Sequence, residues 1–226
     1  MSAEPTAQII RPAKLSEIAA ERLRERILRG QLAPGSPLSQ EALAREFGIS
    51  RTPLRDALKT LERDGLIVLD PTGAASVIDP NNDDARDLLL IREVIDAVAA
   101  RRAALLTVPV RRELGNVLAP ILTELQESAA SEDRYEFRVA DSRFHVAILS
   151  HCQLDYLDRC HAFVHTTALS MFAARAPSPG HLGEAAAEHD KIATALMAGD
   201  SDLSAKLARD HVRHAYDYYF RDWPAR

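Results

Sequence analysis

Apolar residues recur at helical spacing over most of the chain, and the first 65 residues predict three helices. The first helix runs from Ser16, a capping residue, to Arg29. A shorter second helix is capped by Ser39, and a third helix is capped by Ser50 and ends near Asp64. The close succession of the second and third helices, with a glycine between them, predicts a helix-turn-helix.

The stretches between and after these helices predict turns and a small hairpin. The sequence LAPGSPLS at residues 32–39 predicts a turn, because it holds two prolines and a glycine. The segments 66–70 and 75–79 alternate apolar and polar residues, as two strands do, around a turn at Gly73. Three helices and a β-hairpin together predict a winged helix-turn-helix domain over residues 8–79.

A polar linker at residues 79–87 separates this domain from a wholly helical second part. Helical periodicity, broken at intervals by Pro, Gly and Ser, predicts an antiparallel bundle over residues 84–222. The expected fold class is therefore mainly α, with an N-terminal winged helix-turn-helix followed by an all-helical bundle. The helices of this bundle are expected near residues 83–106, 109–129, 132–150, 153–175, 182–198 and 200–221.

Composition and charge narrow the class of protein. The chain has 226 residues and a net charge of −5, yet residues 11–65 hold 11 basic and 8 acidic side chains. A mildly basic N-terminal region suits contact with a polyanion. No apolar run approaches the roughly 18 residues of a membrane span, and the N-terminus lacks the apolar stretch of an export signal. If Cys152 and Cys160 share a helix, they lie about 12 Å apart, too far for a disulfide. We therefore expect a cytoplasmic protein with no membrane contact.

Two arginines open the third predicted helix, where the partial positive charge of a helix start ordinarily favours acidic side chains. Arg51 and Arg55 lie one turn apart and share a face. The second helix of a helix-turn-helix enters the major groove, so the expected anion is double-stranded DNA. Ser50 and Thr52 offer hydroxyls to a phosphate, and the turn at Gly73 is short enough to approach the adjacent minor groove.

The alternative for the two arginines is a pair of surface charges bound to Asp56 or Glu62, and the surrounding sequence argues against it. The stretch ILRGQLAPGSPLSQEALAREFGISRTPLRDALKTLERDGLI closely resembles the DNA-binding domain of GntR-family transcription regulators. Its landmarks are the G-x-L-x-P-G turn, GISRTPLRDAL and L-x-x-D/E-G-L. One departure is Glu41, which stands where some members carry a DNA-contacting arginine. The resemblance implies operator contacts by Ser50, Arg51, Thr52 and Arg55.

Four polar residues of the second part have the chemistry of a metal site. Asp141 and His145 are spaced i,i+4 on a predicted helix, while His189 and His211 lie beside apolar stripes of later helices. One carboxylate and three imidazoles can hold Zn²⁺, Ni²⁺ or Mn²⁺ and leave a position open. Spacing alone does not choose this set, and a histidine on an apolar face is more often a hydrogen-bonded core residue. Two other histidine pairs are also about one turn apart: His161 with His165, and His211 with His214.

The second part also has a family resemblance, over roughly residues 84–221. It is similar to the FCD effector domain of the FadR subfamily in its D-x3-H, its E-H about 44 residues later and its H about 22 residues further on. Arg92 and Arg138 are candidates for pairing with an effector carboxylate or for surface salt bridges. The resemblance implies a small carboxylate effector and a divalent transition metal, Zn²⁺ first, held by Asp141, His145, His189 and His211.

Together these features predict a ligand-responsive transcription regulator, a repressor that binds a palindromic operator as a homodimer. Two alternatives stay open. A metal-dependent hydrolase would use a metal-activated water, but the sequence has no G-x-S-x-G, H-E-x-x-H or Gly-rich phosphate loop, and no catalytic residue is assigned. An architectural DNA binder would use the histidines only as core residues and would take up no metal.

Overall fold

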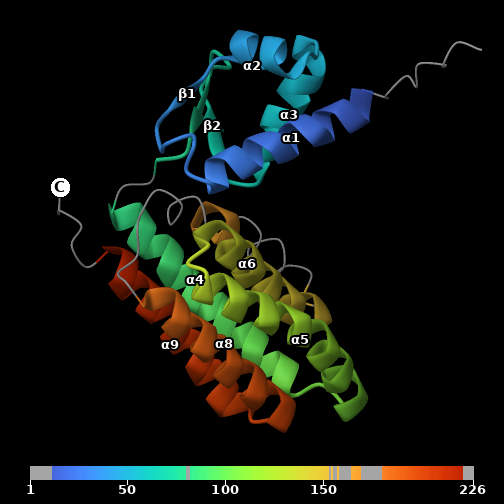
Figure 1. Cartoon of the computed structure of the whole chain (residues 1–226), viewed down its shortest axis with the longest axis vertical. Helices are drawn as coiled ribbons and strands as arrows, with labels where there is room; N and C mark the ends of the chain where they lie inside the picture. The colour runs from blue at the N-terminus through green and yellow to red at the C-terminus, as the bar shows by residue number, and fades with distance from the viewer. Residues whose placement is uncertain are drawn as a thin grey trace, which may run out of the picture. The chain divides into compact units, whose positions relative to one another are not determined.

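The computed structural model describes residues 12–79, 82–152, 154, 157, 164–168 and 180–220. The chain divides into two compact units, one that ends at Ile78 and one that begins at Asp79 (Figure 1). No helix in the described part of the chain is long and apolar enough to span a membrane. Cys160 lies outside the described residues, so the structure does not bear on its predicted separation from Cys152.

The N-terminal unit contains three helices, as the sequence predicts. The helices are α1 (Pro12–Leu28), α2 (Gln40–Phe47) and α3 (Arg51–Arg63). The predicted start of the first helix was wrong, because Ser16 lies inside α1 and the helix begins at a proline, which is well tolerated in a first turn. Leu23 of α1 is buried, as are Leu54 and Leu58 of α3, and the packing of α1 on α3 contributes to the core of the unit.

The N-terminal caps of α2 and α3 differ in the role of the serine side chain. The Ser39 hydroxyl accepts a hydrogen bond from the backbone N–H of Ala42, at 3.3 Å, and so caps α2. Gly48 ends α2 in the left-handed region, at φ 65°. Ser50 holds the extended backbone of an N-cap, but its side chain makes no capping hydrogen bond. The Ser50 hydroxyl therefore stays exposed at the start of α3.

A three-stranded antiparallel sheet completes this unit, in the order β1-β3-β2. The predicted hairpin is formed by β2 (Ile67–Leu69) and β3 (Ala75–Val77). The strand β1 (Pro37–Leu38) lies in the stretch predicted only as a turn, and it pairs with β3. Between β2 and β3 the Asp70 carboxylate accepts hydrogen bonds from the backbone N–H groups of Thr72 and Ala74. The turn therefore has a defined shape.

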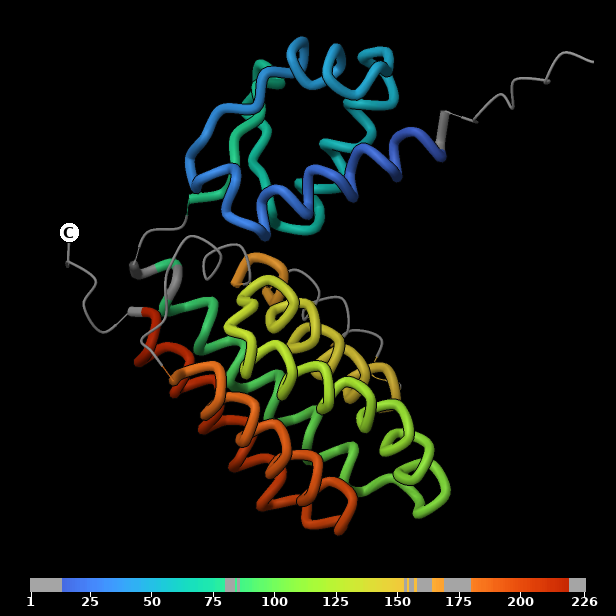
Figure 2. Tube along the Cα trace, viewed as in Figure 1, coloured from blue at the N-terminus to red at the C-terminus, as the bar shows by residue number. Residues whose placement is uncertain are grey.

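The second unit is a bundle of long helices (Figure 2). Helix α4 packs along α9, and α5 packs against α6 and α8. The predicted helix over 153–175 falls mostly outside the described residues, of which 164–168 are helical. The mainly α fold, with a winged helix-turn-helix and a helical bundle, is confirmed. The long helices are α4 (Asn82–Ala104), α5 (Val108–Ala130), α6 (Arg134–His151), α8 (His181–Ala198) and α9 (Ser201–Phe220).

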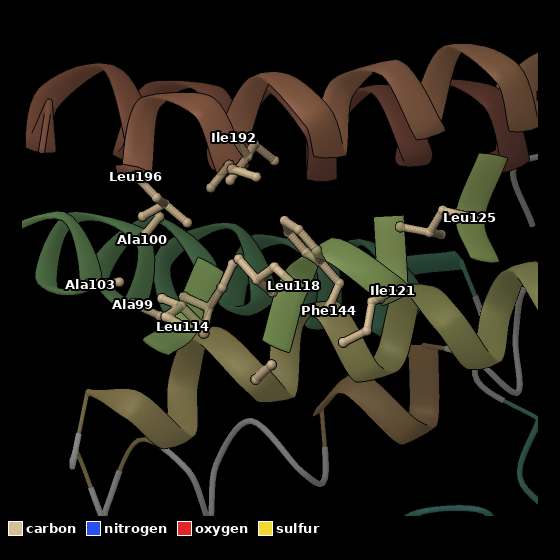
Figure 3. Close-up of a cluster of buried hydrophobic side chains, with 14 of the residues drawn as sticks. Ala99, Ala100, Ala103, Leu114, Leu118, Ile121, Leu125, Phe144, Ile192 and Leu196 are labelled. Carbon is tan, nitrogen blue, oxygen red and sulfur yellow. The ribbon is translucent and has the colours of Figure 1, made fainter. Parts of the chain in front are cut away.

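The apolar core of the bundle is shared by α4, α5, α6, α8 and α9. Figure 3 shows Leu196 of α8 directed toward Ala100 of α4, and Phe144 of α6 close to Leu118 of α5. Alanines on α4 allow the neighbouring helices to approach closely. Phe144 is fully buried and precedes His145, so the same helix that fills the core also carries polar residues into it.

Candidate functional sites

Three helices of the bundle bring four metal-ligating side chains together. Asp141 and His145 lie one turn apart on α6, His189 lies on α8 and His211 on α9. All four residues are buried, and His189 is completely inaccessible. Each offers one nitrogen or oxygen atom, and these atoms all lie within 4.8 Å of one another. The cluster could therefore hold a metal ion.

The distances within this cluster fit a single ion. The Oδ1 atom of Asp141 lies 3.6 Å from the Nε2 atom of His145, 3.1 Å from that of His189 and 3.7 Å from that of His211. Ligand atoms in a tetrahedral zinc site lie about 3.3 Å apart, given metal–ligand bonds near 2 Å. The Nε2 atoms of His145 and His189 are buried and have no hydrogen-bond partner, which is costly unless something occupies the space between them.

The opposite ring nitrogen of each histidine faces an oxygen outside the cluster. His189 donates from Nδ1 to the Ala185 carbonyl, at 2.7 Å, and His211 donates from Nδ1 to Glu188, at 2.9 Å. The Nδ1 atom of His145 lies 3.4 Å from Asp96. Because a carbonyl or a carboxylate can only accept, these contacts place the proton on Nδ1. The Nε2 atoms face inward, toward Oδ1 of Asp141, as metal ligation requires, and a metal ion would displace any proton that they carry.

Burial and the carboxylates set the ionisation of the cluster. Burial lowers the pKa of His145 to about 4 and also lowers the pKa of His189, so both rings are neutral. Burial opposes the charge of Asp141, but the three histidines outweigh it and hold the pKa of Asp141 well below its usual value. Burial likewise opposes the charge of His211, but contacts with Asp141 and Glu188 outweigh it and raise its pKa. The site therefore presents one carboxylate among imidazoles.

The two arginines considered for an effector are both buried, so the alternative of surface salt bridges was wrong. Arg92 is 2% exposed and donates from Nε to Asp96, at 3.1 Å. Its Nη2 atom lies 3.6 Å from Oδ2 of Asp141 and has no hydrogen-bond partner. Arg138 is 7% exposed, and burial lowers its pKa. Arg92 thus adjoins the cluster and keeps one donor for a further anion.

The competing histidine pairs do not form an equivalent site among the described residues. His161 lies outside them. His165 is buried, with its ring centre 5.7 Å from that of His145, so it borders the cluster. His214 is exposed and contacts Glu188 through Nδ1, at 2.5 Å. Sequence reasoning missed Asp96 and Glu188 as outer partners, although Asp96 lies one turn from Arg92 and Glu188 adjoins His189.

The predicted DNA-binding side chains lie at the exposed start of α3. Ser50, Arg51, Thr52 and Arg55 are all exposed, whereas Gly73, at the tip of the β2–β3 turn, is half-buried. Arg51 lies 4.0 Å from Glu41, and no ion pair joins either arginine to Asp56 or Glu62 in the described structure. Glu62 instead accepts a hydrogen bond from the backbone N–H of Leu69. Arg51 and Arg55 are therefore accessible to an anion.

Comparison with known proteins covers both units. Residues 15–77 match the model of the bacterial regulatory proteins of the gntR family, and residues 87–214 match the FCD domain. The chain is 33% identical to the gluconate operon transcriptional repressor of Bacillus licheniformis over 135 residues, which cover 60% of this chain but 54% of that protein, about half its length. It is 27% identical to the transcriptional repressor RspR of Escherichia coli over 207 residues, 84% of this chain and 82% of that protein.

Solved structures agree in fold. The structure of Escherichia coli McbR/YncC matches with a TM-score of 0.76 at 21% identity, and the match covers 93% of this chain and 99% of that chain. A transcriptional regulator from a Rhodococcus species matches with a TM-score of 0.77 at 22% identity, over 92% of this chain and 99% of that chain. The arrangement of helices is therefore shared with these two proteins.

Proposed function

The chain belongs to the GntR family of bacterial transcription regulators and carries an FCD domain, and from this premise we propose a ligand-responsive repressor. It binds a palindromic operator as a homodimer, and a small carboxylate bound at the metal site modulates that binding. Membership of a regulator family sets aside the alternative of a metal-dependent hydrolase. The observation that carries the proposal is the buried cluster of Asp141, His145, His189 and His211.

The start of α3 is the proposed reading surface. Arg51 and Arg55 project from one exposed face, and an arginine fork can bind guanine O6 and N7 or clamp a phosphate. Ser50 and Thr52 supply hydroxyls to a phosphate, and the turn at Gly73 approaches the minor groove. One such surface reads a half-site, so two copies related by two-fold symmetry match a palindrome.

The second copy is proposed to dock on an apolar face of α4. Ile91, Val94 and Val98 of α4, together with Leu105 in the turn that follows it, are between 45% and 61% exposed. Their spacing is that of a heptad seam, with Ile91, Val98 and Leu105 seven residues apart and Val94 three after the first. A helix face that is self-complementary in this way suits a two-fold interface. It also explains why such large apolar side chains stand on a surface.

The metal cluster is the proposed effector site. A divalent transition metal, Zn²⁺ first and Ni²⁺ or Mn²⁺ next, supplies an open position to a carboxylate oxygen when bound. This chain contributes the four ligands, and Arg92 offers its Nη2 atom, which makes no hydrogen bond, to the same carboxylate. Arg138 is a second candidate for that pairing. Similarity to a gluconate operon repressor makes sugar acids the first compounds to test.

The effector acts by differential binding to two conformations of the dimer. If it binds better to a conformation whose two DNA-binding units are wrongly spaced, it lowers operator affinity by that difference. The test is operator binding by metal-loaded protein, followed by fluorescence anisotropy, with and without sugar acids and dicarboxylates. A loss of affinity with one class of acid is expected. Affinity that stays constant across the whole panel, in protein that takes up no metal, would favour the architectural DNA binder.

A further inference from the structure

One carboxylate joins the buried cluster to the protein surface. Glu188 of α8 accepts from Nδ1 of His211 through one oxygen, at 2.9 Å, and contacts Nδ1 of His214 through the other, at 2.5 Å. The His211 side chain is 4% exposed and that of His214 is 53% exposed. Glu188, at 21%, lies between them. The three side chains therefore form a chain of contacts from a metal ligand to solvent.

Glu188 differs from the outer partners of the other two histidines. The Ala185 carbonyl that receives Nδ1 of His189 belongs to the same helix as that histidine, so helix geometry alone orients the ring. Asp96 beside His145 is buried and is held by Arg92. Glu188 comes from α8, while both of its histidine partners lie on α9. The Nδ1 atom of His211 is therefore oriented by a side chain from another helix, not by the backbone of its own helix.

From these contacts we propose that Glu188 is a positioning residue of the metal site, and that His214 holds Glu188 in place from the surface. Glu188 keeps the proton of His211 on Nδ1 and turns Nε2 toward Asp141. Carboxylates that accept from a metal-bound histidine in this way raise the basicity of the ligand and fix its tautomer. This role rests on the metal binding proposed above. It means that Glu188 and His214, which are not metal ligands, contribute to metal affinity.

If Glu188 made only a structural contact between α8 and α9, replacing it would have different measurable effects. Such a contact would contribute to the stability of the metal-free protein without changing where the proton of His211 resides. A positioning role instead shifts the tautomer of His211 in the metal-free protein and weakens metal binding. The groove that exposes Glu188 is lined by Glu184, Lys191, Asp217 and Tyr218 among others, so a nearby carboxylate is present as a control.

The experiment compares Glu188→Ala, Glu188→Gln and His214→Ala with wild-type full-length protein. Glu184→Ala is the matched control, because Glu184 lies one turn earlier on the same helix and contacts Tyr218 instead of a histidine. Zn²⁺ affinity is measured by competition with a chromogenic chelator. The tautomer of His211 is measured in metal-free protein by long-range ¹H–¹⁵N NMR of the imidazole nitrogens.

Glu188→Ala is expected to weaken Zn²⁺ binding by about 10- to 100-fold and to populate the Nε2–H tautomer of His211. Glu188→Gln keeps an accepting oxygen, so it retains the Nδ1–H tautomer and recovers part of the affinity. His214→Ala weakens binding less than Glu188→Ala, and Glu184→Ala binds like wild type. Wild-type affinity and tautomer in Glu188→Ala would overturn the inference. If wild-type protein took up no Zn²⁺, the metal-responsive function itself would fail, and the role of Glu188 with it.

Discussion

The Nε2 atom of His189 lies 3.1 Å from the Oδ1 atom of Asp141, in a part of the bundle where His189 has no exposed surface at all. The two residues come from different helices, α8 and α6, and Phe144 packs edge-on against the His189 ring with centres 4.7 Å apart. A polar pair in such surroundings carries a large desolvation cost. A metal ion bound there would offset that cost, because it would satisfy both ligand atoms at once.

Asp141→Asn is therefore expected to disrupt metal binding more than any outer-partner substitution. It removes the only charged ligand of the set, so Zn²⁺ affinity should fall by more than about 100-fold. Wild-type protein should gain about 2.7 kcal/mol of stability at Zn²⁺ concentrations 100 times the dissociation constant, and the variant almost none. Thermal unfolding with and without Zn²⁺ measures both.

The control for this substitution is Asp190→Asn on α8. Asp190 accepts a hydrogen bond from Gln126, at 2.7 Å, and is not one of the four clustered ligands. It should therefore keep the wild-type response to Zn²⁺. An equal response in Asp141→Asn would show that the cluster is not the metal site.

Arg51→Ala and Arg55→Ala should each weaken operator binding by about 1–3 kcal/mol, roughly 5- to 150-fold. Both side chains are exposed at the start of α3, and each is proposed to supply either a base contact or a phosphate contact. The control is Arg63→Ala, because Arg63 is 76% exposed at the opposite end of the same helix. Fluorescence anisotropy at several salt concentrations separates the two kinds of contact. If Arg63→Ala lost as much operator affinity as the other two variants, the start of α3 would not be the surface that reads DNA.

The sequence predicted most of the fold because helix periodicity and capping are local properties. The spacing of Asp141 and His145, four residues apart, likewise predicted that they share one face of a helix. That His189 and His211 lie beside them could not be predicted from spacing, because it depends on how α8 and α9 pack against α6. Only the family resemblance selected those two histidines. The two-residue strand β1 was missed since its pairing with β3 leaves no periodic signal.

The buried charges were harder to predict. Arg92 and Asp96 are one turn apart, a spacing typical of a surface ion pair, yet both are almost inaccessible. Glu188 adjoins His189 along the chain but contacts a histidine of another helix. In both cases the environment of the side chain comes from tertiary packing, which a single sequence does not encode in any local pattern.

Val94→Glu is expected to convert the proposed dimer into a monomer. Val94 is 60% exposed near the middle of the apolar face of α4, and a two-fold interface there would bring two glutamates together in an apolar seam. Val146→Glu is the control, because Val146 is an exposed valine, 42% accessible, on α6. Sedimentation velocity gives the mass of each variant. Operator affinity should fall in parallel in Val94→Glu, since a monomer reads one half-site, and a dimeric Val94→Glu would place the interface elsewhere.

Acid sensitivity is expected from His181, which begins α8 and is buried against Tyr218 and Tyr219, with ring centres 4.1 Å and 5.3 Å away. Burial, with a smaller contribution from His211, lowers the pKa of His181 to about 4, although Glu188 and Asp141 act in the opposite direction. The unfolded chain protonates its histidines near pH 6.5 and so binds more protons than the folded state. Stability conferred by neutral His181 is therefore present above pH 6.5 and is lost as the pH falls toward 4.

The variant His181→Phe keeps an aromatic ring against Tyr218 but cannot take up a proton. Urea unfolding of the metal-free variant should therefore show a smaller loss of stability between pH 7 and pH 5 than in wild type. An identical pH dependence, or an NMR titration of His181 with a midpoint near 6.5, would contradict this origin of the acid sensitivity.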